Sequence, residues 1–240
     1  MSGQFDGAIW PLIQRRARLH SSQPFVTSID ADGFRTELSG TSLSNAVAKT
    51  AGALADEAGL EPGARIAMHL PWHWQRVTWT LAAWTVGAVV AVDGDVGTAD
   101  LVVTDRSNAA ALAEVDEPWV VSLHPLGLVE QGLPSTVVDA TGLCRMQPDA
   151  LLIEPATGDG LALELPSGQQ FTRVQGADWV RGQLADADAR LLIDRLGDDD
   201  PAAWLIATLL PLLGSGAVVI TDGGDIAAIA TQEGATRIWP

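Results

Sequence analysis

The sequence contains one structural pattern twice, and this repeat constrains the fold more than any short motif does. The motif GAVV at residues 87–90 recurs at residues 216–219, and Asp93-Gly94 recurs at the same offset as Asp222-Gly223. An apolar, tryptophan-bearing stretch precedes each motif. Because a repeat of this kind marks a duplicated unit, each copy helps to interpret the other.

Both copies show the same order of predicted elements. In each, two β-rich runs flank a turn (residues 25–38 and 161–174), and helices and strands then alternate as far as residues 104 and 239. Short apolar strands that alternate with helices indicate largely parallel sheets covered on both faces. We therefore expect an α/β fold of two pseudo-repeated lobes packed as one globular unit. The first lobe, with the connecting segment, is expected at residues 1–160 and the second at residues 161–240.

The charge of the chain excludes some classes of partner. Its 240 residues carry a net charge of −16, which repels phosphate backbones and anionic lipid. We therefore expect no nucleic-acid or membrane partner. The uncharged stretch at residues 202–220 contains Pro211 and a Gly-Ser-Gly break, so it predicts a buried helix and strand rather than a membrane span. A single cysteine and no signal-peptide pattern favour a cytoplasmic protein.

Several soft packing motifs resemble those of the adenylate-forming superfamily, which includes the AMP-binding acyl-CoA synthetases. The run PGARIA at residues 62–67 resembles the family's PGDRV-like strand. The run LAAWTVGAVV at residues 81–90 resembles its AxxxxGAVxVP segment, and residues 209–220 resemble its LxxGAxxVL stretch. The resemblance covers roughly residues 33–240 and implies the N-terminal portion of such an enzyme, with its two related α/β lobes.

The resemblance also indicates where a phosphate-binding loop would lie. In the family this loop is rich in Ser, Thr and Gly and ends in Pro-Lys-Gly, and its backbone amides hold the phosphates of ATP. Here the corresponding segment is PSGQQFTR at residues 166–173, and the candidate remnants are Ser167, Gly168, Gln169, Thr172 and Arg173 in place of the lysine. Two interpretations remain open: a plain hairpin turn, as in the first copy, or a surviving site for ATP or AMP with Mg²⁺.

Other candidate residues carry weaker predictions. His73 lies between two tryptophans at a strand-to-helix turn, where open α/β sheets bind ligands, so it is a candidate cleft residue. His69 and His73 have a metal-like spacing, but Pro71 breaks the helix that such a pair requires, and we expect no metal site. Cys144 has no nucleophile signature around it and is expected to be a buried or incidental thiol.

The resemblance leads to two hypotheses about function. The family's adenine-binding segment, its mobile C-terminal domain and its catalytic lysine are expected beyond Pro240. These missing parts, together with the reduced phosphate loop, favour a non-catalytic module that binds or scaffolds. We then expect no catalytic residue in this sequence, and a partner that is another protein or a second copy of the chain. The alternative is an ATP- or AMP-binding protein, or an adenylate-forming ligase whose missing domain is supplied in trans.

Overall fold

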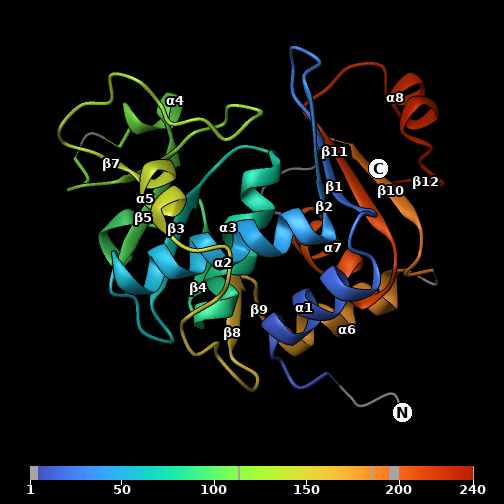
Figure 1. Cartoon of the computed structure of the whole chain (residues 1–240), viewed down its shortest axis with the longest axis horizontal. Helices are drawn as coiled ribbons and strands as arrows, with labels where there is room; N and C mark the ends of the chain where they lie inside the picture. Colours follow the sequence, from blue (N-terminus) through green and yellow to red (C-terminus); the bar gives the residue numbers. More distant parts are fainter. Residues whose placement is uncertain (1–4, 113, 185, 195–199, 240) are drawn as a thin grey trace.

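Two β-sheets lie side by side, and between them helix α3 (Trp74–Val86) packs against helix α7 (Pro201–Leu213) (Figure 1). The computed structural model describes residues 5–112, 114–184, 186–194 and 200–239. The smaller sheet has five strands in the order β12-β10-β11-β1-β2, and only its β1–β2 pair is antiparallel among the described strands. Its strands are β1 Pro24–Ile29, β2 Arg35–Ser39, β10 Arg190–Asp194, β11 Ala217–Thr221 and β12 Arg237–Trp239.

The larger sheet has seven strands in the order β7-β6-β5-β3-β4-β8-β9, and its β8–β9 pair is antiparallel. The remaining described pairings are parallel. The expected α/β class with largely parallel sheets is therefore confirmed. The strands of this sheet are β3 Arg65–His69, β4 Val89–Val92, β5 Leu101–Asp105, β6 Trp119–Val121, β7 Val138–Asp139, β8 Leu161–Glu164 and β9 Gln170–Thr172.

Each copy of the repeat adds its hairpin to the sheet of the other copy. Strand β1 lies parallel to β11, with Val26 opposite Val218, and β8 lies parallel to β4, with Leu163 opposite Val90. The order β12-β10-β11-β1-β2 therefore matches β5-β3-β4-β8-β9 strand for strand. The expected boundary at residue 160 therefore does not assign one sheet to each part of the chain, because each sheet contains strands from both sides of that residue. Hydrophobic periodicity identifies strands but not their partners, so this exchange is not visible in the sequence.

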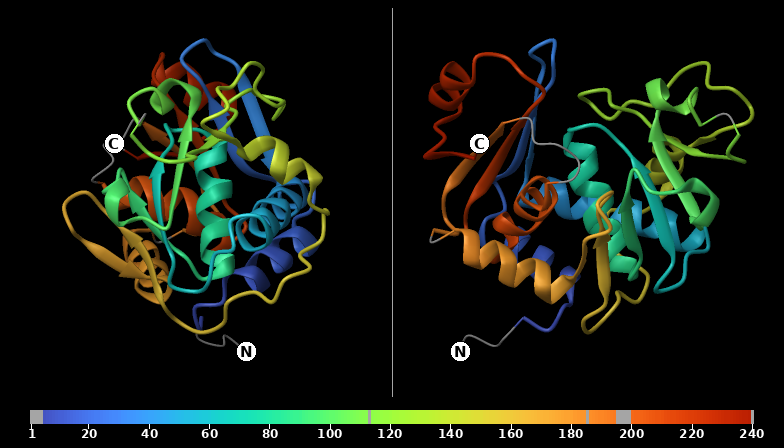
Figure 2. Two further views of the ribbon diagram at one scale, coloured as in Figure 1. Left: turned by 90° about the vertical axis from the view of Figure 1, so that its left-hand side faces the viewer. Right: turned by 180° about the vertical axis from the view of Figure 1, so that it is seen from behind.

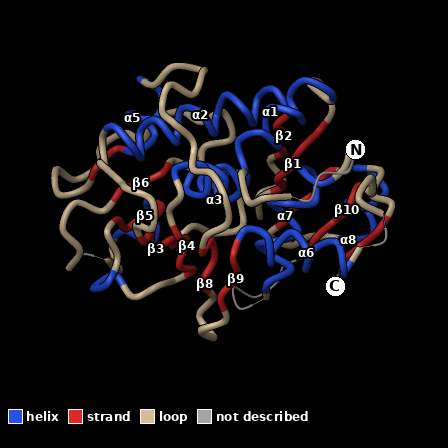
Figure 3. The backbone as a smooth tube through the Cα atoms, turned by 90° about the horizontal axis from the view of Figure 1, so that it is seen from below, coloured by secondary structure: helices blue, strands red, loops and turns tan. Residues whose placement is uncertain are grey.

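Helices cover the sheets and fill the space between them. Helix α2 packs against α1, α3 and α5, whereas α7 packs against α6, α1 and α3 (Figures 1 and 2). Figure 3 shows α1 and α2 running along one side of the molecule. The bounds are α1 Ile9–Leu19, α2 Gly40–Asp56, α3 Trp74–Val86, α4 Arg106–Ala109, α5 Ala140–Met146, α6 Arg173–Gln183, α7 Pro201–Leu213 and α8 Ile226–Glu233, with a 3₁₀ turn η1 at Val96–Thr98.

The two central helices begin and end where their sequences dictate. Helix α3 starts at Trp74, because the side chain of His73 accepts a hydrogen bond from the amide of Gln75 and caps the helix. Gly87 ends it in the left-handed conformation, with φ of 84°. Helix α7 has Pro201 in its first turn and Asp200 as its cap.

The expected buried helix and strand over residues 202–220 are confirmed as α7 and β11. Every residue of α3 is buried, because this helix contacts β4 of one sheet and β1 and β2 of the other. The indole of Trp84 donates a hydrogen bond of 2.7 Å to the carbonyl of Ala162, which satisfies its polar atom in the core. Among the described residues, no helix is both long and apolar enough to cross a membrane.

Candidate functional site

The segment that resembles a phosphate loop forms the tip of the β8–β9 hairpin. The amide of Gly168 donates to the carbonyl of Leu165 at 2.8 Å, and the amide of Leu165 donates to the carbonyl of Gln169 at 2.9 Å. Gly168 has a φ of +83°, which a glycine adopts without strain. Ser167, Gly168 and Gln169 are exposed at this tip.

The hairpin of the first copy has the same turn. Gly33 donates to the carbonyl of Asp30 at 3.0 Å, Asp30 donates to the carbonyl of Phe34 at 3.1 Å, and Gly33 also has a φ of +83°. Ser167 and Asp32 therefore occupy equivalent places in two matching turns. The backbone conformation at residues 165–169 is one that this fold uses twice, so a bound phosphate is not needed to explain it.

Thr172 and Arg173 lie at the other end of the hairpin. Three residues of extended chain lie between Gln169 and Arg173, and the four residue steps that join them span roughly 13 Å. The Thr172 hydroxyl accepts a hydrogen bond from the amide of Gln175, and the Gln175 side chain accepts one from the amide of Thr172. This capping box starts α6. The structure thus brings Ser167, Gly168 and Gln169 together but not Thr172 and Arg173 with them.

The Arg173 side chain is turned into the protein. Its guanidinium donates to the carbonyl of Gly158 at 2.8 Å and to that of Trp84, at the end of α3, at 3.4 Å. Arg173 is only 4% exposed, and burial lowers the pKa of its guanidinium. The cation therefore joins the β9–α6 junction to the end of α3. The role of these five residues in binding a nucleotide remains a prediction.

His73 lies at the carboxyl edge of the larger sheet, as expected, but its ring is buried. Its Nδ1 accepts the amide of Gln75 at 3.3 Å, and the ring lies 5.4 Å from that of Trp74. Burial lowers the pKa of His73 to about 4, against the opposing effect of Asp30. The imidazole is therefore neutral near pH 7 and acts as a helix cap.

His69, at the end of β3, faces a carboxylate. Its Nδ1 lies 3.3 Å from a carboxylate oxygen of Asp93, at the end of the neighbouring strand β4. Within the described part of the chain, no three His, Cys, Asp or Glu side chains gather as metal ligands would. Cys144 is half-buried, and desolvation of its thiol raises the pKa to about 12.

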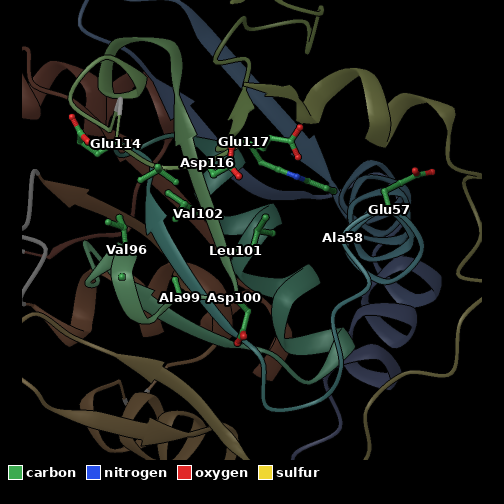
Figure 4. Close-up of a pocket in the computed structure, with 13 residues that line it drawn as sticks. Glu57, Ala58, Val96, Ala99, Asp100, Leu101, Val102, Glu114, Asp116 and Glu117 are labelled. Carbon is green, nitrogen blue, oxygen red and sulfur yellow. The ribbon is translucent and has the colours of Figure 1, made fainter. Parts of the chain in front are cut away.

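Two adjoining cavities involve none of these residues, and no motif described above predicts them. One, of about 500 Å³, lies by the first residues of β5 and β6 and is bordered by five carboxylates from three segments (Figure 4). The other, of about 350 Å³, is mainly apolar and lies between α4 and the loop before β7. The run of acidic residues at positions 114–117, interrupted only by Val115, was the one signal in the sequence for the first cavity.

Comparison with known structures defines the class of protein to which this fold belongs. The whole chain has the fold found in the N-terminal part of acyl-CoA synthetases, and it spans about half the length of the solved structures it matches. It superposes on an acyl-CoA synthetase of Brucella canis with a TM-score of 0.76 at 21% identity, covering 98% of this chain and 47% of that one. For ATP-bound MatB of Rhodopseudomonas palustris the TM-score is 0.68 at 16% identity, with 98% and 49% covered. For a fatty acyl CoA synthetase of Mycobacterium tuberculosis it is 0.70 at 12% identity, with 95% and 48% covered.

A relative in sequence identifies the family. A TIGR03089 family protein of Mycobacterium tuberculosis is 33% identical over 198 residues, which cover 80% of this chain and 79% of that protein. This chain belongs to the TIGR03089 family. No protein-family model matches the sequence. The resemblance to adenylate-forming enzymes is thus confirmed at the level of fold.

Proposed function

We propose that this chain is a non-catalytic module of acyl-CoA synthetase-like fold, which binds or scaffolds a partner and does not adenylate acids itself. One observation carries the proposal: the only cation of the candidate phosphate segment, Arg173, donates to main-chain carbonyls inside the protein. Catalysis of phosphoryl chemistry depends on positive charge held against the charge that develops at phosphorus. In this segment that charge serves to hold α6 and α3 together.

The geometry of the hairpin gives further support. Adenylation would require the exposed tip and a cation to meet at the same phosphates, yet roughly 13 Å of extended chain separates Gln169 from Arg173. The matching turn at residues 30–34 indicates that the tip conformation is a property of the fold. A partner, which we expect to be another protein or a second copy of this chain, would then be the ligand.

The competing function is nucleotide binding at the same tip. The exposed Ser167 and Gly168 favour it, because a glycine lets a phosphate approach the backbone closely and a hydroxyl adds a donor. MatB of Rhodopseudomonas palustris was solved with ATP bound, and its structure covers nearly all of this chain. This alternative predicts an affinity for ATP or AMP that depends on Ser167.

Calorimetric titration with Mg·ATP, and separately with AMP, distinguishes the two functions. The structure supplies a matched control, because Asp32→Ala changes the same position of the twin turn that Ser167→Ala changes in the candidate site. We expect no heat of binding at millimolar nucleotide and no ATP–pyrophosphate exchange with any carboxylic acid. Micromolar binding that Ser167→Ala weakens and Asp32→Ala leaves intact would contradict the proposal and establish the alternative.

A further inference from the structure

Among the described residues, no long helix covers one face of the larger sheet. The crossover from β3 to β4 runs through α3 and moves in one direction along the sheet, whereas the connections from β5 to β6 and β6 to β7 move in the other. Because such crossovers are right-handed, the two sets lie on opposite faces. On one face, the connection from β3 to β4 contains the 13-residue helix α3. On the opposite face, the connection from β5 to β6 contains only the four-residue helix α4 among its described residues.

Under these short connections lies the apolar cavity of about 350 Å³. Its volume is at the lower end of the range for ligand pockets in proteins. Aliphatic side chains dominate its lining, and Arg106 at its border is already bound to Glu130 and to the carbonyls of Gln131 and Gly132. The apolar lining residues include Leu112, Val115, Pro118, Val120, Leu133 and Val137. A cavity of this kind accommodates one or two large apolar side chains.

The acidic cavity adjoins the apolar one and shares Val115 with it. Its carboxylates come from the end of α2, from the turn before β5 and from the segment before β6 (Figure 4). No arginine or lysine lines it, and none of these carboxylates forms an ion pair within the described ranges. The five are Glu57, Asp100, Glu114, Asp116 and Glu117. Five carboxylates around one cavity make the potential there negative, which attracts a cationic partner.

We propose that these two adjoining cavities form a docking surface for a basic amphipathic segment of a partner protein. An apolar side chain of that segment enters the 350 Å³ cavity, and its lysines or arginines face the carboxylates around the 500 Å³ cavity. Apolar and acidic halves side by side fit an amphipathic peptide better than a small cation, which would use only one of them. This inference rests on the proposed function as a binding module and names the chemistry of its partner.

The probe is a fluorescein-labelled amphipathic helical peptide with leucines on one face and lysines on the other, and anisotropy measures its binding to the full chain. We expect the triple variant Glu114→Gln, Asp116→Asn, Glu117→Gln to bind it about tenfold more weakly. The control variant Asp32→Asn, Glu61→Gln, Glu154→Gln removes the same charge from exposed positions outside both cavities and should leave the affinity within about twofold of the parent. Equal weakening in both variants would show attraction to the net charge alone and would overturn the proposal.

The apolar half has its own test. Ala110 lines the apolar cavity and is exposed, so Ala110→Trp fills the cavity without disturbing the core, and we expect it to abolish peptide binding. A second peptide, with serine in place of leucine, should bind the parent chain weakly. Its affinity should be no higher than that of the leucine peptide for Ala110→Trp. No binding of the leucine–lysine peptide, or unchanged binding to Ala110→Trp, would refute the docking surface. Adenylating activity would refute the proposed function instead. The peptide measurements would still test the docking surface, because they do not depend on that activity.

Discussion

The guanidinium of Arg173 donates a hydrogen bond of 2.8 Å to the carbonyl oxygen of Gly158. The bond closes the connection that leads into β8, and the second donor contact to Trp84 ties the same cation to the end of α3. Arg173 therefore joins segments 15 and 89 residues away in the chain. An arginine in this position stabilises the packing of the second copy's hairpin onto the first copy's sheet.

Replacing Arg173 should cost stability rather than ligand affinity. Arg173→Ala removes a charged donor from one buried and one partly buried carbonyl contact, and we expect the free energy of unfolding to fall by about 2–3 kcal/mol in urea denaturation. Arg181→Ala is the control on the same helix, because its ion pair with Asp178 is exposed and is worth about 0.5 kcal/mol or less. Equal effects of the two substitutions would contradict the structural role of Arg173.

The stability of the protein should decrease as the pH falls through the range in which His73 would become protonated. Burial lowers the pKa of His73 to about 4 from the ordinary 6.5, so between these values the unfolded chain binds a proton that the folded chain excludes. The full penalty, reached below pH 4, is about 3 kcal/mol. His73→Asn keeps a side-chain acceptor for the cap and should flatten the difference in unfolding free energy between pH 7 and pH 4. An unchanged pH dependence in this variant would exclude His73 as the source.

Much of the fold follows from the sequence, because its elements are marked by local physical chemistry. Strand β10, at Arg190–Asp194, is a short apolar run of the kind that predicts a buried strand, and Asp200 with Pro201 marks the start of α7. Gly33 and Gly168 mark both hairpin turns. Each of these turns and caps is determined by residues close to it in the sequence. The elements of one copy of the repeat therefore predict the elements of the other copy.

The pairing of the strands and the environment of the site are not local properties. The turn at residues 166–169 was predicted, but the inward direction of the Arg173 side chain depends on Gly158 and Trp84, which are distant in sequence. The cavities depend in the same way on loops that meet only after the sheet has formed. Val115 borders both of them, and its position in the chain gives no indication of this.

The thiol of Cys144 should be unreactive in the folded protein. Burial raises its pKa to about 12, so little thiolate is present at pH 8. With Ellman's reagent we expect the native thiol to react at least about a hundredfold more slowly than the thiol of the urea-unfolded chain, whose pKa is about 8.5. Fast native labelling would show that the cysteine is accessible and would remove the physical basis of this prediction.

The exchange of hairpins predicts how the chain behaves when it is divided. A fragment of residues 161–240 would contain β10, β11 and β12 without β1, so that Val218 and Ile220, both at most 1% exposed in the whole protein, would lie on an edge strand without its neighbour. Fully burying a side chain of this size contributes about 1.5–3 kcal/mol. Helix α7 would also lose its contacts with α1, α3 and β1. A fragment of residues 1–160 would likewise lack β8 and β9 beside β4.

We therefore expect neither fragment to show a cooperative thermal transition by circular dichroism, and an equimolar mixture to recover one, because each hairpin finds its sheet in the other fragment. A chain cleaved at residue 160 after folding is the control and should keep its transition. Cooperative unfolding of the isolated 161–240 fragment would contradict the exchanged topology, since two lobes built each from its own copy would fold independently.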